Sequence, residues 1–140
     1  NVVEPGKRPR VTLTPSLALR DGEPFLAFSV QGGDTQDQNL LQFFLNVVEF
    51  GMNPQAAAEA HNITSYQMQS SFGAHQAEPG RIEVTRELSG YTRGRLAEMG
   101  YDVDVVDRTY SPITAILLDR EHGTMWGAAS DYGDDYGVAW

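Results

Sequence analysis

A pair of adjacent glycines, placed between an apolar strand and a long apolar helix, constrains the fold of this chain most strongly. An apolar run leads directly into Gly32 and Gly33. Because glycine has no Cβ atom, the backbone here can take a positive φ or lie close to a reacting group. A helix is predicted to follow, with Asp34 as its cap and Gly51 just beyond its C-terminus. The segment 29–55 is therefore predicted to fold as strand, tight turn, helix and second helix.

The predicted helix is apolar on almost every side. Apolar side chains recur at helical spacing over residues 40–50 and leave only a thin polar stripe, formed by Asn39, Gln42, Asn46 and Glu49. We expect such a helix to be nearly engulfed by the rest of the fold. Asn53 and Pro54 suit the cap and the first turn of the second helix, which continues through the alanines at 56–58.

Turn signals divide the rest of the chain. The Asp21-Gly22 pair predicts a β-hairpin between residues 12–20 and 25–30. Further elements are predicted as a short strand near 63–68, strands at 81–85 and 101–106, a helix at 89–99, and a closing hairpin of 115–119 with 124–128. These elements predict an α+β fold of about five strands and three helices, with the helices packed on one face of an antiparallel or mixed sheet.

Composition excludes several classes of function. The net charge of −9, from 10 basic and 19 acidic residues, argues against a nucleic-acid partner. The absence of cysteine excludes disulfides, a thiol nucleophile and thiolate metal sites. No apolar run is long enough to predict a membrane span. The 140 residues fit a single domain or part of a larger one, and residues 1–10 are expected to be a connecting segment. The cellular compartment stays open.

The diglycine is the one candidate for chemistry. Two backbone N–H groups that point at one spot can stabilise the developing oxyanion of acyl transfer, and a helix N-terminus beside them favours an anion. The alternative is an ordinary turn, because diglycines are common in turns. A dinucleotide-binding GxGxxG pattern is absent. The chain thus offers an oxyanion hole without a nucleophile, so we expect it to be inactive alone.

Other reactive side chains have no spacing that indicates a site. The histidines His61, His75 and His122 do not form a metal-ligand motif, so we expect them to be solvated. The acidic residues Asp131, Asp134 and Asp135 lack the twelve-residue calcium-loop pattern and are expected to form a solvated acidic end. The residues therefore predict no metal site.

Five segments together resemble the C-terminal part of the small subunit of γ-glutamyltranspeptidases. They are Pro9-Arg-Val-Thr-Leu-Thr-Pro15, Asp21-Gly22-Glu-Pro-Phe25, Gly32-Gly33-Asp34, Leu45-Asn-Val-Val-Glu-Phe-Gly-Met-Asn53 and Gly127-Ala-Ala-Ser-Asp131. The most specific part is the glycine pair followed at fixed distance by the segment from Leu45 to Asn53. The similarity covers nearly the whole chain.

The resemblance implies a fold and a role. Members of this family are N-terminal-nucleophile hydrolases with an αββα sandwich, in which self-cleavage frees a threonine nucleophile. By analogy, Gly32 and Gly33 supply the oxyanion hole of a γ-glutamyl transferase or hydrolase that acts on glutathione or a related amide. No cofactor is implied. The expected partners are the small-molecule substrate, the large subunit and upstream part of the same protein, and further copies of the chain.

Two departures from the family pattern keep alternatives open. The nucleophilic threonine lies upstream of this sequence, which is therefore expected to be a fragment. Where typical members have two serines that bind the substrate's α-carboxylate, this chain has Val11 and Thr12. Because valine cannot donate a hydrogen bond, only Thr12 is predicted to touch the substrate. An acylase or amidohydrolase of the same superfamily, with a non-glutamyl substrate, and a catalytically silent interaction domain are the alternatives.

Overall fold

Seven strands and three helices make up the part of the chain that the computed structural model describes, residues 2–9, 11–109 and 112–132. In chain order they are β1 (Ser16–Arg20), β2 (Glu23–Val30), α1 (Gln36–Val48), α2 (Pro54–Glu59), β3 (Ile63–Ser65), β4 (Arg81–Thr85), α3 (Gly90–Glu98), β5 (Asp102–Val106), β6 (Ile113–Asp119) and β7 (Thr124–Ala129). The α+β class is confirmed. The stated total of about five strands is too low, because all seven segments predicted as strands form strands, and these belong to two sheets.

The larger sheet is antiparallel, with strand order β1-β2-β6-β7. Asp21 and Gly22, with φ of 55° and 83°, form the tight turn that joins β1 to β2, as predicted. The strand begins only at Ser16, so residues 12–15 lie outside it. The closing hairpin of β6 and β7 is also confirmed.

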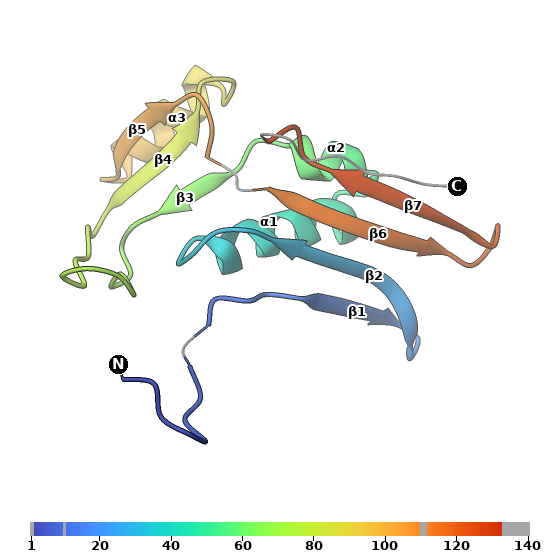
Figure 1. Ribbon diagram of the computed structural model, residues 1–140. Helices are drawn as coiled ribbons and strands as arrows, with labels where there is room; N and C mark the ends of the chain where they lie inside the picture. Colours follow the sequence, from blue (N-terminus) through green and yellow to red (C-terminus); the bar gives the residue numbers. More distant parts are fainter. Residues whose placement is uncertain (1, 10, 110–111, 133–140) are drawn as a thin grey trace.

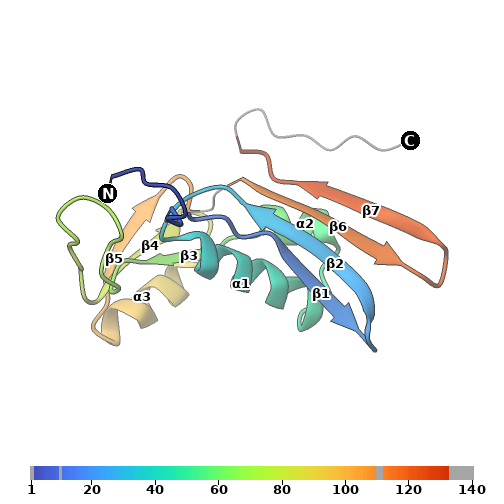
Figure 2. The same ribbon diagram turned by 60° about the horizontal axis from the view of Figure 1, so that its bottom comes forward.

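Helices α1 and α2 cover one face of the larger sheet (Figures 1 and 2). The rings of Phe43 and Phe44 pack against Phe28 of β2, at centroid distances of 5.6 and 5.7 Å. The buried core between sheet and helices consists of Leu26, Val30, Leu40, Phe43, Val47, Ala57, Ala58, Ile113, Ala115 and Ala128. Small alanines on α2 and β7 let these two elements approach closely, whereas larger side chains fill the space beneath α1.

The expected burial of α1 is wrong in two respects. Asn39, placed in the outer polar stripe, is completely buried, and its Oδ1 accepts a hydrogen bond of 2.7 Å from Nδ2 of Asn62. Leu41 and Phe50, expected on the buried surface, are 58% and 72% exposed. The helix therefore buries one face and includes in it a polar residue that has a partner from another segment. The prediction for α2 is confirmed, since Asn53 Oδ1 accepts from the Ala56 N–H.

The smaller sheet has strand order β3-β4-β5, with β4 and β5 parallel and α3 connecting them. Arg81 is the first residue of its central strand, β4, and forms ion pairs with Glu83 and Asp104, both at 2.8 Å. Burial and the hydrogen bond from the Tyr66 hydroxyl to Glu83 raise the pKa of Tyr66 to about 12. Among the described residues, no helix is both long and apolar enough to span a bilayer.

Two glutamines of α1 attach the smaller sheet to the larger unit. The side-chain amide of Gln42 donates to the Ile63 carbonyl (2.9 Å) and accepts from the Ile63 N–H (2.8 Å). Gln38 makes the same paired contact with Ser65, at 3.1 and 2.7 Å. Residues four apart on a helix and two apart on a strand have nearly the same spacing, about 6 to 7 Å. Two amides on one helix face can therefore pair with the free edge of β3.

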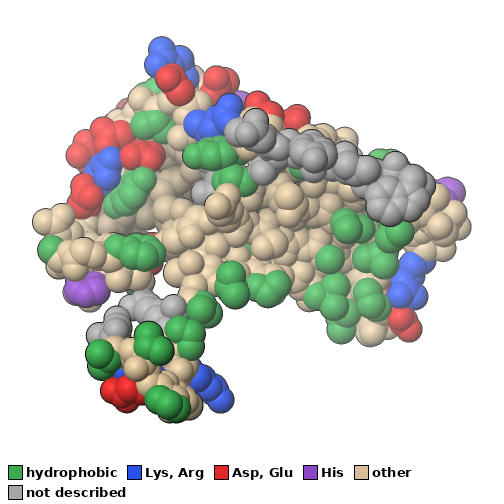
Figure 3. Space-filling view, in the orientation of Figure 1, with side chains coloured by type: hydrophobic (Ala, Val, Ile, Leu, Met, Phe, Trp, Pro, Cys, Tyr) green, Lys and Arg blue, Asp and Glu red, His purple; other side chains and the backbone are tan. Residues whose placement is uncertain are grey.

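The second face of the larger sheet carries no helix (Figures 1 and 2). A row across it contains Leu17, Ala27, Ile116 and Gly127, which are paired neighbours in the sheet. Leu17 and Ile116 are 60% and 47% exposed. Figure 3 shows hydrophobic side chains gathered over the hairpin end of this face. A sheet face of this kind suits packing against a second layer.

Candidate functional site

The diglycine connects the end of β2 to the start of α1. Gly32 has a φ of 153°, whereas the φ of Gly33 is not positive. The requirement for glycine on conformational grounds therefore applies to Gly32. The Gln31 N–H donates to the Pro112 carbonyl (3.0 Å), and the Gln36 N–H donates to the Gly33 carbonyl (3.2 Å). Hydrogen bonds thus fix the turn on both sides of the glycine pair.

The N–H groups of Gly32 and Gly33 are unpaired within the described part of the chain. They lie immediately before α1, whose N-terminus carries a partial positive charge. Two free donors at this position can bind an anion or a carbonyl oxygen that is becoming negative.

The prediction that Asp34 caps α1 is wrong. Thr35 occupies the N-cap position, and no side chain of the described residues caps the helix. The Asp34 carboxylate instead accepts hydrogen bonds from Ser70 Oγ (3.1 Å) and the Ser71 N–H (2.6 Å). Those donors come from the segment between β3 and β4, so a tertiary contact replaces the local one.

Thr12 and Gly32 line the same cleft, which has a volume of about 650 Å³. Its wall consists of Thr12, Leu13, Thr14, Pro15, Ser29, Val30, Gln31, Gly32, Gln36, Pro112 and Thr114. Thr12 is half-buried, and the neighbouring Val11 is 61% exposed. The structure thus brings together two of the three predicted site residues. Gly33, the third, packs instead against the ring of Phe72.

Gln36 belongs to this cleft but is missed by sequence reasoning. Its side chain is only 5% exposed, and its Nε2 donates to the Val30 carbonyl at 2.9 Å. The bond connects the first turn of α1 to the last residue of β2, across the diglycine. A polar residue on the buried side of an amphipathic pattern is the only signal in the sequence that indicates such a role.

The other titratable candidates have no active-site surroundings. His61, His75 and His122 are all exposed, as expected. The hydrogen bond from His122 lowers the pKa of Asp119, at the tip of the last hairpin. No group of three or more potential metal ligands occurs in the described ranges. Within the predicted acidic end, Asp131 forms an ion pair with Arg108, while Asp134 and Asp135 lie outside the described residues.

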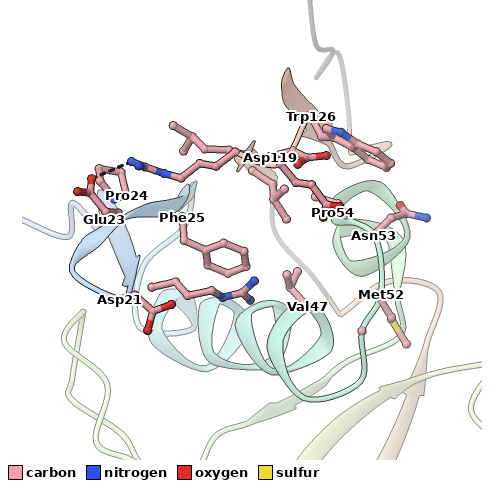
Figure 4. A pocket seen from close by; sticks show the side chains of 16 residues that line it. Asp21, Glu23, Pro24, Phe25, Val47, Met52, Asn53, Pro54, Asp119 and Trp126 are labelled. Carbon is pink, nitrogen blue, oxygen red and sulfur yellow. Dashed lines mark hydrogen bonds and ion pairs between the residues drawn. The ribbon is translucent and has the colours of Figure 1, made fainter. Parts of the chain in front are cut away.

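A second large cleft lies at the opposite, hairpin end of the larger sheet (Figure 4). Phe25, Val47 and Trp126 line it, together with charged residues of the two hairpin turns. The Arg20 guanidinium lies 3.6 Å from the centre of the Phe25 ring, and Arg120 pairs with Glu23 at 2.9 Å. These charges already have partners in the hairpin turns, and neither the diglycine nor Thr12 reaches this cleft.

Comparison with known proteins gives consistent matches. The sequence model of the family described as Gamma-glutamyltranspeptidase matches residues 1–140. The chain is 31% identical to the glutathione hydrolase proenzyme of Bacillus subtilis strain 168 over 129 residues, which is 92% of this chain and 20% of that protein. It spans about a fifth to a quarter of the curated relatives that it matches first.

Solved structures extend the comparison to the fold. A γ-glutamyltranspeptidase from Pseudomonas nitroreducens, complexed with L-DON, superimposes with a TM-score of 0.75 at 25% identity, over 100% of this chain and 68% of that one. A cephalosporin acylase from Bacillus halodurans gives a TM-score of 0.81 at 25% identity, over 99% of this chain and 24% of that one. The fold of this chain is thus similar to that of the matching part of both proteins.

Proposed function

The chain belongs to the γ-glutamyltranspeptidase family, and from this premise we propose that it contributes the oxyanion hole of an amide hydrolase or acyltransferase. The observation that carries the proposal is the diglycine. The Gly32 and Gly33 N–H groups are unpaired in the described part of the chain and adjoin the N-terminus of α1. Gly32 also shares a cleft with Thr12. The nucleophile belongs to a segment outside this sequence.

In the proposed reaction, the hydroxyl of the absent threonine attacks the substrate carbonyl and gives up its proton to the threonine's own α-amine. The carbonyl oxygen becomes an oxyanion and accepts hydrogen bonds from Gly32 and Gly33. Collapse of this intermediate expels the amine, which takes the proton, and leaves an acyl-enzyme. Water or an acceptor amine then attacks the acyl-enzyme. Each oxyanion donor contributes about 10² to 10³ in kcat in enzymes of this type.

The acyl group that we propose first is γ-glutamyl, with Thr12 as donor to its carboxylate end. Because Val11 offers no second hydroxyl, we expect this chain to bind that carboxylate more weakly than two serines would. The same observation favours the second candidate, a non-glutamyl acyl group as in an acylase or amidohydrolase. Similarity to a cephalosporin acylase also supports this candidate. The third candidate is a catalytically silent interaction domain, in which no substrate would be turned over in this cleft.

We also propose that the remainder of the protein covers the helix-free face of the larger sheet. An αββα sandwich places two sheets face to face, and that face is apolar at Leu17 and Ile116. Helices α1 and α2 form the outer layer on the other side. In the isolated chain this face is then uncovered, so we expect the chain to associate with itself or with the remainder of the protein.

The test uses the full-length protein and two anilides that differ only in the α-amino and α-carboxyl groups, γ-glutamyl and butyryl p-nitroanilide. A larger kcat/KM for the γ-glutamyl anilide supports the γ-glutamyl candidate, whereas a larger kcat/KM for the other anilide supports the acylase candidate. Val11→Ser, which adds a donor, should raise the preference for γ-glutamyl about tenfold. Thr12→Val should lower it by a similar factor, whereas Thr124→Val, in the distant closing hairpin, should leave it unchanged. Absence of turnover with every acyl group tried contradicts the enzyme proposal.

A further inference from the structure

The segment between β3 and β4, residues 66–80, is a folded loop rather than a loose excursion. The Glu78 N–H donates to the Tyr66 carbonyl (2.9 Å), and the Ser70 N–H donates to the Gln76 carbonyl (2.8 Å). At the tip, the His75 N–H donates to the Phe72 carbonyl at 3.1 Å. These bonds close the loop at three levels, so its tip is positioned by the backbone. We call it the β3–β4 loop.

The tip of the β3–β4 loop is fastened to the diglycine turn. Asp34 follows Gly33 directly, and its carboxylate accepts from Ser70 Oγ and the Ser71 N–H. Ser70 Oγ in turn accepts from the Phe72 N–H at 3.1 Å. Figure 1 shows the loop, in yellow-green, reaching back toward the start of α1. The Phe72 side chain is therefore held beside the turn that carries the proposed oxyanion hole.

Phe72 lies directly on the diglycine. A Cβ atom built on Gly33 would be only 2.8 Å from Cε2 of the Phe72 ring, so ring and backbone are in contact. The ring is still 58% exposed. Its free surface lines a cleft of about 460 Å³ that also includes Met68 and Tyr66. An aromatic ring exposed to this extent in a rigid tip has room to pack against a ligand.

Gly32 and Gly33 thus separate two clefts. Gly32 lines the one that contains Thr12, whereas Gly33 contacts Phe72, which lines the other. When the oxygen of a tetrahedral carbon is held on the N–H groups, the acyl chain and the amine leave that carbon in different directions. With the acyl chain in the cleft of Thr12, the cleft lined by Phe72 is left for the amine.

We propose that Phe72 forms the wall against which the amine part of the substrate packs, and that it selects flat or aromatic amines over ammonia. The inference rests on the proposed function, since it requires a carbonyl at the diglycine. It assigns a specificity role to a residue of the β3–β4 loop. Asp34 acts as a positioning residue, because it holds the loop tip without touching the amine.

The experiment uses the full-length protein and two substrates with the same acyl group, a p-nitroanilide and the primary amide. The acyl group is whichever the protein turns over. Phe72→Ala should lower kcat/KM for the anilide about tenfold and leave kcat/KM for the primary amide within about twofold. Asp34→Asn should shift the same ratio in the same direction, to a smaller extent. Phe50→Ala is the matched control, because Phe50 is 72% exposed and lies beyond the other end of α1.

Three results overturn the inference, and they are distinguishable. Equal loss on both substrates means that Phe72 only supports the diglycine. An unchanged kcat/KM for both substrates means that the amine does not reach the ring. Failure of the unaltered protein to hydrolyse any amide instead removes the proposed function and this inference with it. Melting midpoints of all three variants identify any loss of folded protein, and the ratio of two substrates on one preparation does not depend on the folded fraction.

Discussion

Replacing Gly32 with alanine separates a catalytic diglycine from a structural turn. A side chain at φ of 153° is strained, and such conformations cost about 1 to 3 kcal/mol. We expect the backbone to relax toward a φ that alanine tolerates, which moves the Gly32 N–H. One oxyanion donor is then lost, which lowers kcat by about 10² to 10³ with a smaller change in KM. Gly33 is less suitable, because a new Cβ would push Phe72.

The matched control for this experiment is Gly22→Ala. Gly22 has a φ of 83° in the turn between β1 and β2, and a Cβ there would meet no other atom of the described residues within 4 Å. Both variants should lose stability by similar amounts, but only Gly32→Ala should lose kcat. The assay measures kcat per folded molecule and the denaturation midpoint on the same preparation. A Gly32→Ala protein that is destabilised like the control and keeps full kcat would refute the reasoning.

Three further predictions concern the isolated chain, the contact between Gln42 and Ile63, and the titration of Tyr66. The isolated 140 residues should release no p-nitroaniline from a γ-glutamyl anilide and should self-associate in sedimentation; turnover above a heat-killed sample, or a clean monomer, would contradict this. Gln42→Leu should lower the free energy of unfolding by about 2 kcal/mol, because it leaves the Ile63 N–H and carbonyl unpaired, whereas Gln69→Leu on the exposed loop should change it little. The raised pKa of Tyr66 means that the folded state keeps a proton that the unfolded state loses above pH 10, so the free energy of unfolding should fall between pH 10 and about 12, and Tyr66→Phe should remove that slope.

Elements set by neighbouring residues could be predicted from the sequence. The Asp21-Gly22 hairpin takes φ values of 55° and 83° at its turn, which these residue types tolerate. Asn53 caps α2 because the acceptor and the donor lie three residues apart. Asp34 looks like the same kind of cap but binds Ser70 and Ser71, more than thirty residues away. A local rule cannot distinguish the two cases, because the competing donors are set by the tertiary fold.

The residues of the candidate site likewise fall into those that the sequence indicates and those that it does not. The glycine pair could be found from its position between strand and helix, and Thr12 only from the family resemblance. Gln36 was missed because a polar residue within an apolar pattern gives no indication of its partner, the Val30 carbonyl. Phe72 was missed because a polar, glycine-containing segment predicts irregular structure but not where its tip lies. In both cases the sequence lacks the long-range contact that defines the role.

The most direct test of the account is a crystal structure of the full-length protein with a boronic acid that mimics the preferred acyl group. Boron forms a tetrahedral, negatively charged adduct with a hydroxyl nucleophile and so reproduces the intermediate. The account predicts one boronate oxygen within about 2.7 to 3.1 Å of the nitrogen atoms of both Gly32 and Gly33. An adduct whose oxygens all face other donors, with both glycine N–H groups left to solvent, would contradict it.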